Sequence, residues 1–217
     1  MIQTKIEKNG GREFLEKINS KNRVTNYLII ANVLVYLLSF LLPIESFMPL
    51  YPFGSDNFFI SQYVTAIFTH LNLVHLFFNM YALYMFGAYI ENKYGAKKYL
   101  TSYLTIGVVA NIIWHLIISP IYPAVGASGA IYGIVAIYVI LNPDAKLSIM
   151  FLPFSFKAKN LFGTFLLIEL CITILGISTG VAHFVHISGA VIGTLFYYFF
   201  MKYRNNKNYK SYINKYR

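Results

Sequence analysis

The sequence predicts an all-α membrane protein, a bundle of six transmembrane helices with both termini on the cytoplasmic side. Hydrophobic residues make up 57% of the 217 residues and charged residues 12%, whereas a soluble domain has about 25% charged residues. Apolar segments recur from residue 27 to residue 201. The basic residues are confined to the two tails and to alternate connecting loops, the pattern typical of a multi-pass membrane protein.

The apolar segments define the expected spans. A transmembrane helix takes about 20 apolar residues, and fewer where protein surrounds it. Pro43, Pro120 and Pro143 follow three of the segments, and proline ends a helix readily. The expected spans are 27–42, 72–90, 99–118, 128–141, 161–177 and 182–201. They form a membrane domain over residues 27–201, between an N-terminal cytoplasmic tail (1–26) and a basic C-terminal cytoplasmic tail (202–217).

The placement of charge sets the expected orientation. All 18 Lys and Arg residues lie in the two tails and in the loops after the second and fourth spans. The other three loops, about 43–71, 119–127 and 178–181, contain none. Since basic loops stay in the cytoplasm, both termini are predicted to be cytoplasmic. The net charge of +10 is then explained by orientation and by anionic lipid, so nucleic acid is not an expected partner.

The cellular location follows from the same features. A multi-pass membrane protein is expected in the cell membrane. The richness in Lys, Asn, Ile and Tyr is compatible with an AT-rich bacterial genome, which favours the bacterial plasma membrane.

A serine flanked by glycines opens the fourth expected span at its outer side. Ser128 lies between Gly126 and Gly129, and polar residues at membrane depth usually mark function. A helix N-terminus offers free backbone N–H groups and the positive end of a dipole, which could hold an oxyanion. The alternative is a capping serine in a contact between small-residue helices.

The sixth span carries a histidine at the same membrane face. His186 shares one helical face with Gly189 and Gly193, which follow it by three and seven residues. Gly129 begins a matching small face beneath Ser128. Small faces let helices pack closely, so we expect the fourth and sixth helices to meet with Ser128 beside His186. A histidine within hydrogen-bond reach can take the serine proton.

Further polar groups lie at about the same depth. Tyr132, one turn below Ser128, is expected to pack under the imidazole and orient it. His75 and Asn79 are four residues apart on one face and could supply oxyanion donors, or simply an interhelical hydrogen bond. No third acidic member is evident, so a Ser–His dyad is predicted. Glu169, the one acid deep in a span, receives no role.

A metal site is the main chemical alternative, because the chain has five histidines. His183 and His186 are three residues apart and could chelate an ion. No nearby acid or cysteine is expected to complete a ligand set, and the HExxH motif does not occur. Neither a metal nor a cofactor is therefore expected.

At these residues the chain resembles the rhomboid family of intramembrane serine proteases. The resemblance covers about residues 25–201 on the six-span frame, and the stretch from Gly87 to Gly95 also resembles the family. The matching residues, in family order, are His70, His75 and Asn79, then Gly126, Ser128, Gly129 and Tyr132, then His186, Gly189 and Gly193.

The resemblance implies Ser128 as nucleophile and His186 as general base. It implies His75, Asn79 and the Ser128 amide as oxyanion stabilisers, and His70 as a residue that steadies the first external loop. It implies cleavage of transmembrane protein substrates near the extracytoplasmic face, without a cofactor. Many members carry Trp-Arg where this chain has Ser61-Gln62, a departure that concerns the anchoring of this loop and not the catalytic set.

Two other functions are compatible with a polytopic chain. The first is a non-catalytic rhomboid-like protein that binds transmembrane clients; such proteins usually lack the serine or the histidine, and both are present here. The second is a transporter or channel, which predicts inverted repeats or paired broken helices. Neither pattern is found in the sequence.

Overall fold

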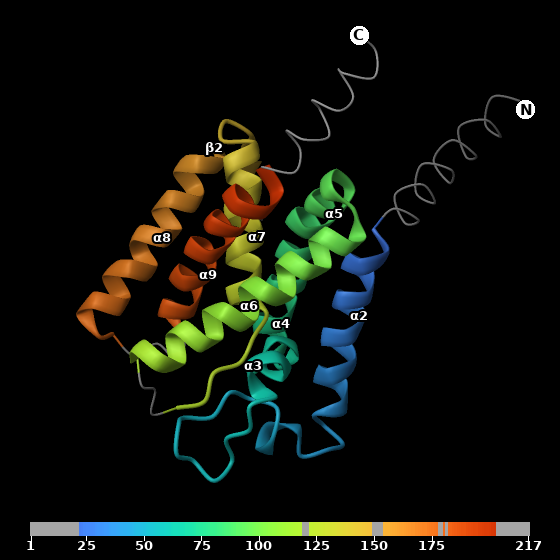
Figure 1. Cartoon of the computed structure of the whole chain (residues 1–217), viewed down its shortest axis with the longest axis vertical. Helices are drawn as coiled ribbons and strands as arrows, with labels where there is room; N and C mark the ends of the chain where they lie inside the picture. Colours follow the sequence, from blue (N-terminus) through green and yellow to red (C-terminus); the bar gives the residue numbers. More distant parts are fainter. Residues whose placement is uncertain (1–21, 119–121, 149–153, 178–179, 181, 203–217) are drawn as a thin grey trace, which may run out of the picture.

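The computed structural model describes residues 22–118, 122–148, 154–177, 180 and 182–202. Within these residues the chain forms a bundle of apolar helices and one short β-hairpin (Figure 1). The predicted tails, 1–26 and 202–217, lie almost entirely outside the described residues.

Among the described residues, apolar helical segments overlap all six expected ranges, and the first is shifted by four residues towards the N-terminus. They are α2 (Arg23–Leu38), α4 (Leu73–Ala82) continued by η3 (Leu83–Gly87) and α5 (Ala88–Tyr94), α6 (Ala96–Ile118), α7 (Ser128–Leu141), α8 (Ala158–Leu175), and α9 (His183–Phe196) continued by η4 (Tyr197–Lys202). Four of them are long and apolar enough to cross a membrane, namely Leu73–Tyr94, Ala96–Ile118, Ala158–Leu175 and His183–Met201. The apolar helices α2 and α7 are shorter, with 16 and 14 residues.

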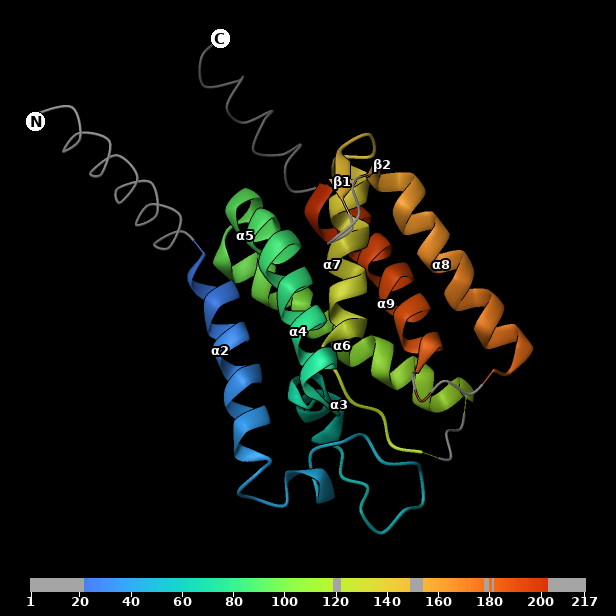
Figure 2. The ribbon, with the colours of Figure 1, turned by 180° about the vertical axis from the view of Figure 1, so that it is seen from behind.

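Helix α7 lies inside the bundle, and α8 lies at its edge (Figures 1 and 2). Half of the α7 residues are buried, whereas in α8 only Ala158 is fully buried. The large side chains of Leu167, Ile174 and Leu175 on α8 are exposed, as expected for a surface that faces lipid. Helix α8 packs against α7 and α9, so its inward face can reach side chains at the centre of the bundle.

The glycine faces of α7 and α9 meet as their spacing predicts. A Cβ on Gly189 would collide with the backbone of Gly129, and a Cβ on Gly193 would collide with the backbone of Gly133. The two backbones are therefore in direct contact, which is the usual role of small residues between membrane helices.

A buried acid ties the first helix to the second apolar segment. The Glu91 carboxylate accepts hydrogen bonds from the backbone nitrogens of Val24 (2.9 Å) and Thr25 (2.8 Å), and from the Thr25 hydroxyl (2.7 Å). These nitrogens belong to the first turn of α2, where N–H groups have no partner in their own helix. A negative charge also suits the positive end of the helix dipole.

The loop between α2 and α3 (Gln62–Thr65) is anchored by Gln62 at the start of α3. Its side chain is fully buried, accepts a hydrogen bond from the Tyr51 nitrogen, and donates to the carbonyls of Phe47 (3.1 Å) and Asn57 (2.6 Å). Its neighbour Ser61 is exposed. Gln62 thus holds three points of this loop, at one of the two positions that depart from the Trp-Arg pattern of the resemblance.

The loop after α7 contains a hairpin that the sequence did not predict. Strands β1 (Lys146–Ser148) and β2 (Ser155–Lys157) pair antiparallel. Before β1, Asp144 contacts the ammonium groups of Lys159 (3.0 Å) and Lys157 (3.1 Å), whose hydrogen bonds hold the pKa of this carboxyl below its usual value. Each strand has three residues, which is too short for an alternating pattern to be read.

The described basic loops lie at one end of the bundle. Figures 1 and 2 show the hairpin and the α5–α6 turn at the same end, and the loop before α3 at the opposite end. The Lys residues of the two basic loops lie in or beside the hairpin and the α5–α6 turn. The loop of residues 43–61 contains no Lys or Arg. The cytoplasmic assignment of the basic end stays a prediction.

Candidate active site

Ser128 is the first residue of α7, and the chain turns sharply just before it. Gly126 has φ +121°, a conformation that favours glycine. A Cβ at Gly126 would lie 2.8 Å from the Cε1 and Nε2 atoms of the His75 ring. The missing side chain therefore allows both the turn and the close approach of His75.

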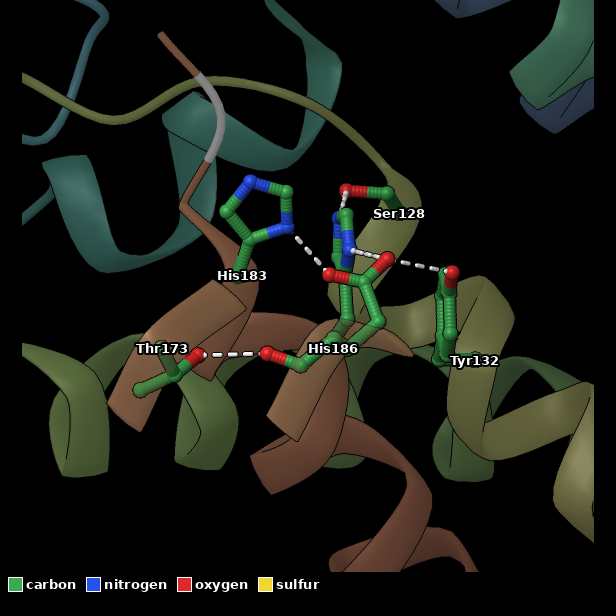
Figure 3. A network of polar contacts seen from close by, with 6 residues as sticks. Ser128, Tyr132, Thr173, His183 and His186 are labelled. Atoms are coloured by element: carbon green, nitrogen blue, oxygen red, sulfur yellow. Dashed lines mark hydrogen bonds and ion pairs between the residues drawn. The ribbon is translucent and has the colours of Figure 1, made fainter. Parts of the chain in front are cut away.

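The structure brings Ser128 and His186 together. The distance from Ser128 Oγ to His186 Nε2 is 2.7 Å, a normal hydrogen-bond length (Figure 3). His186 lies one turn into α9 and is 8% exposed. The glycine contact between α7 and α9 brings these two side chains, 58 residues apart in the sequence, within reach.

Tyr132 lies under the imidazole, as its spacing from Ser128 predicts. The rings of Tyr132 and His186 are stacked, with centroids 4.4 Å apart and an interplanar angle of 4°. Figure 3 shows the two rings edge-on beside each other. This contact limits rotation of the imidazole about its side-chain bonds.

An acid also contacts the histidine, contrary to the prediction of a two-residue site. Glu169, on α8, places Oε1 2.8 Å from His186 Nδ1 and 2.7 Å from the Tyr132 hydroxyl. Its Oε2 is bonded to His183 Nδ1. The Glu169 side chain is 12% exposed. The expectation that no third acidic member is present was therefore wrong.

A carboxylate beside Nδ1 is compatible with only one tautomer of a neutral His186. An ionised carboxylate can only accept hydrogen bonds, so a neutral His186 must donate from Nδ1. Its Nε2 then presents a lone pair and accepts a hydrogen bond from the Ser128 hydroxyl. This is the tautomer that a general base for Ser128 requires.

Glu169 and the two histidines that it contacts, His183 and His186, are also a possible set of metal ligands. Ligand atoms of Glu169, His183 and His186 lie within 4.8 Å of one another, so the expectation that no acid lies near the two histidines was wrong. Ligands at about 2.0–2.2 Å from a tetrahedral zinc ion stand roughly 3.3–3.6 Å apart. The 2.8 Å separation of Glu169 Oε1 and His186 Nδ1 fits a direct hydrogen bond better than two ligands of one ion.

His75 and Asn79 share a cavity with the Ser128–His186 pair. The cavity has a volume of about 620 Å³, and Gly126 and Tyr132 also line it. The Asn79 amide donates one hydrogen bond to the His75 carbonyl (2.9 Å), and an amide nitrogen has a second N–H to offer. Both predicted oxyanion donors thus border the space beside Ser128.

His70 lies outside the apolar helices, between η2 (Ala66–Phe68) and α4, and supports His75. Its buried ring meets the His75 ring edge-on, with centroids 5.0 Å apart. Burial first, and then the neighbouring His75, lower the pKa of His70 to about 3. His70 is therefore neutral near pH 7 and acts here as a packing group against His75.

Comparison with known proteins finds rhomboid proteins as relatives of this chain. The Rhomboid domain family model matches residues 58–203 of the chain. The "Presenilin-associated rhomboid-like protein, mitochondrial" of Homo sapiens is 31% identical over 183 residues, which cover 81% of this chain and 48% of that protein. "Rhomboid protease GluP" of Bacillus subtilis is 40% identical over 81 residues, which cover 36% of this chain and 16% of that protein.

A plant protein is similar over a shorter region. "Rhomboid-like protein 11, chloroplastic" of Arabidopsis thaliana is 34% identical over 116 residues, covering 54% of this chain and 41% of that protein. The chain thus spans about half or less of the length of these relatives. By their names and organisms these relatives include a mitochondrial, a chloroplastic and a bacterial protein, so the likeness does not single out the bacterial plasma membrane.

Proposed function

The chain belongs to the rhomboid family, and on that basis we propose that it is an intramembrane serine endopeptidase. Ser128 is the nucleophile and His186 the general base in this proposal. The observation that carries it is the 2.7 Å hydrogen bond between Ser128 Oγ and His186 Nε2, formed by two polar residues inside apolar helices. Such residues are costly in a membrane and mark function.

The reaction follows from this hydrogen bond. Ser128 Oγ attacks the carbonyl carbon of a substrate peptide bond while His186 Nε2 takes its proton. The imidazolium then gives that proton to the leaving amine, which yields an acyl-enzyme. Water, deprotonated by the same nitrogen, attacks the ester and releases Ser128.

The oxyanion is stabilised from two sides. The first backbone N–H groups of α7, including that of Ser128, have no partner in their own helix and lie at the positive end of its dipole. His75 and Asn79 face the same cavity from α4. Donors placed in advance around the developing charge are usually the largest catalytic contribution.

The substrate is a transmembrane segment of another protein. Its helix must unwind locally, because a helical peptide carbonyl is hydrogen-bonded and shielded. In this proposal it enters from lipid past α8 and is cut near the extracytoplasmic face, in a bacterial plasma membrane. Membrane lipid is then the other partner, and neither a cofactor nor a metal is required.

The test is cleavage of a model transmembrane substrate by the full chain in proteoliposomes. We expect Ser128→Ala and His186→Ala to abolish cleavage, and Ser128→Ala to abolish labelling by a fluorophosphonate probe. Ser188→Ala is the matched control, since Ser188 is a buried serine of α9 that does not line the cavity. Its hydroxyl has no hydrogen-bond partner among the described residues, so its removal should leave cleavage unchanged.

Two results would contradict the proposal. Cleavage by Ser128→Ala at the wild-type rate would exclude this serine as nucleophile. A folded wild-type protein that neither cleaves nor reacts with the probe, but binds transmembrane segments, would instead be a non-catalytic rhomboid-like protein.

A further inference from the structure

The site contains a carboxylate that the two-residue mechanism does not use. We propose that Glu169 is a positioning residue of the reaction, which holds His186 in the tautomer and orientation that activate Ser128 and balances the charge of the imidazolium. This inference rests on the proposed function and deepens it, because it makes the site a Ser–His–Glu triad instead of a dyad.

The order of contacts supports this role. Ser128 Oγ meets Nε2 of His186, and the opposite nitrogen, Nδ1, meets Glu169 Oε1 at 2.8 Å. The imidazole therefore bridges a hydroxyl and a carboxylate. The same arrangement of nucleophile, base and acid occurs on unrelated protease folds, and it is recognised by geometry and not by sequence position.

Both carboxylate oxygens are held in place. Oε1 also accepts from the Tyr132 hydroxyl at 2.7 Å, and Oε2 is bonded to His183 Nδ1. Figure 3 shows His186 with Tyr132 on one side and His183 on the other, and dashed lines join both to an unlabelled carboxylate, that of Glu169. The acid is thus fixed by two residues that do not contact the Ser128 hydroxyl, as expected of a preorganised group.

A purely structural role is the alternative. Glu169 also links α8 to α7 and α9, and a hydrogen-bonded tie between membrane helices is common. A neutral glutamine could make such a tie without placing a charge among apolar helices. Only the carboxylate is restricted to accepting from Nδ1, so only the carboxylate enforces the tautomer with a free lone pair at Nε2.

The proton balance is simple. When Ser128 attacks, its proton moves to Nε2, and His186 carries a positive charge beside the negative Glu169. The Nδ1 proton stays on Nδ1 throughout, because the carboxylate stabilises the imidazolium without taking its proton. Nε2 then delivers its proton to the leaving amine, and no further reactant is required.

The experiment measures the rate of fluorophosphonate labelling and the kcat for a transmembrane substrate in proteoliposomes. Glu169→Gln keeps the shape but can donate its amide to Nδ1, so we expect labelling and kcat to fall by about 10²- to 10⁴-fold. Glu169→Asp is shorter but keeps the charge, and should retain more activity than Glu169→Gln. The tautomer of His186 can be read from its ¹⁵N chemical shifts in a Ser128→Ala background. We expect the proton on Nδ1 when residue 169 is Glu, and on Nε2 in the Glu169→Gln variant.

Thr173→Val is the matched control. The Thr173 hydroxyl donates to the backbone carbonyl of Glu169 at 2.8 Å, one turn further along the same helix (Figure 3). This substitution removes a hydrogen bond of α8 without touching the carboxylate, so labelling should stay within a few-fold of wild type.

The outcomes separate this inference from the proposed function. If the wild type labels and cleaves but Glu169→Gln is as active as Glu169→Asp or more so, or the tautomer is unchanged, Glu169 is a structural tie only. If the wild type itself neither labels nor cleaves, the proposed function fails. The histidine shifts still show in that case whether Glu169 sets the tautomer, and an unchanged tautomer overturns the inference.

Discussion

At Ser128 the neighbouring residues determine what the side chain can do. Gly126 supplies the turn and the space for His75, and Gly129 supplies the contact with α9. Ser128 is the first residue of α7, and from this position its hydroxyl forms the hydrogen bond to His186. Another hydroxyl of these helices is used differently: that of Thr194 in α9 donates to the backbone carbonyl of Ala190, four residues earlier.

The oxyanion role of Asn79 can be tested by truncation. Asn79→Ala removes an amide donor that borders the cavity beside Ser128, while the backbone donors of α7 remain. Loss of one oxyanion donor costs roughly 100-fold or more in kcat. We expect that fall in substrate turnover per folded molecule, with a much smaller change in KM.

Asn32→Ala is the control for this truncation. Like Asn79, Asn32 is a buried asparagine whose amide donates to the carbonyl four residues earlier, Leu28 at 2.7 Å. It lies in α2 and does not line the cavity. Equal losses of kcat in Asn79→Ala and Asn32→Ala would mean that both act through stability and that Asn79 has no oxyanion role.

Residues that recur along one helix were easier to predict than residues that meet across helices. The spacing of Gly189 and Gly193 from His186 is set by helical geometry alone, and so is the position of Tyr132 under Ser128. The contact of Glu169 with His186 depends on the rotation of α8 about its axis, which its sequence does not determine. The available signal was the cost of one acid in an apolar span.

The α7–α9 contact is the element on which the site depends most directly. Gly189→Ala would place a methyl group into the backbone of Gly129 and force the helices apart. Overpacking of this kind typically costs about 1–3 kcal/mol. Because Ser128 and His186 lie at the same end of this contact, we expect a lower unfolding temperature in detergent and loss of most fluorophosphonate labelling.

Gly163→Ala gives the matched control in α8. No atom lies within 4 Å of a Cβ built at Gly163, and the residue has ordinary helical backbone. Alanine is favoured over glycine in a helix by up to about 1 kcal/mol, so this variant should be as stable as wild type or more so. A Gly189→Ala protein with unchanged labelling would show that close packing here is not needed for the site.

Elements with a long apolar pattern were predicted, and short polar ones were not. Within the described residues an apolar helix overlaps each of the six expected ranges, but the first, α2, begins and ends four residues earlier than expected and stops before Pro43. The hairpin β1–β2 and the anchoring of the first loop by Gln62 depend on a few local hydrogen bonds, which leave no periodic signal. The departure from Trp-Arg at Ser61-Gln62 left the anchoring of this loop open, and the structure shows Gln62 itself bonded to the loop.

The orientation of the whole molecule can be tested by labelling from one side of the membrane. In a Cys171→Ala background, which removes the only cysteine, single cysteines can replace Lys97, Lys146 or Asp56, all exposed in loops or at element ends. We expect an impermeant maleimide added outside intact cells to label Asp56→Cys only, because basic loops stay in the cytoplasm.

Permeabilised cells provide the control, since all three cysteines should then react. Labelling of Lys97→Cys and Lys146→Cys from opposite sides would contradict the predicted spans, because an even number of crossings separates these two loops in the bundle. If only Lys97→Cys and Lys146→Cys react from outside, the orientation is opposite to the prediction, and the cavity lies at the cytoplasmic face.

Helix α8 has two properties that would conflict if the helix were displaced. It is the least buried of the long apolar helices, and it carries the acid that contacts the base. A hydrogen bond is lost once its heavy atoms separate beyond about 3.5 Å. The contact between His186 and Glu169 is 2.8 Å long, so a movement of α8 that lengthens it by about 0.7 Å would release the histidine. If a substrate helix enters past α8 as proposed, His186 would lack its contact with Glu169 while α8 is displaced. Ser128 would then be activated only after α8 has returned to the position seen in the structure.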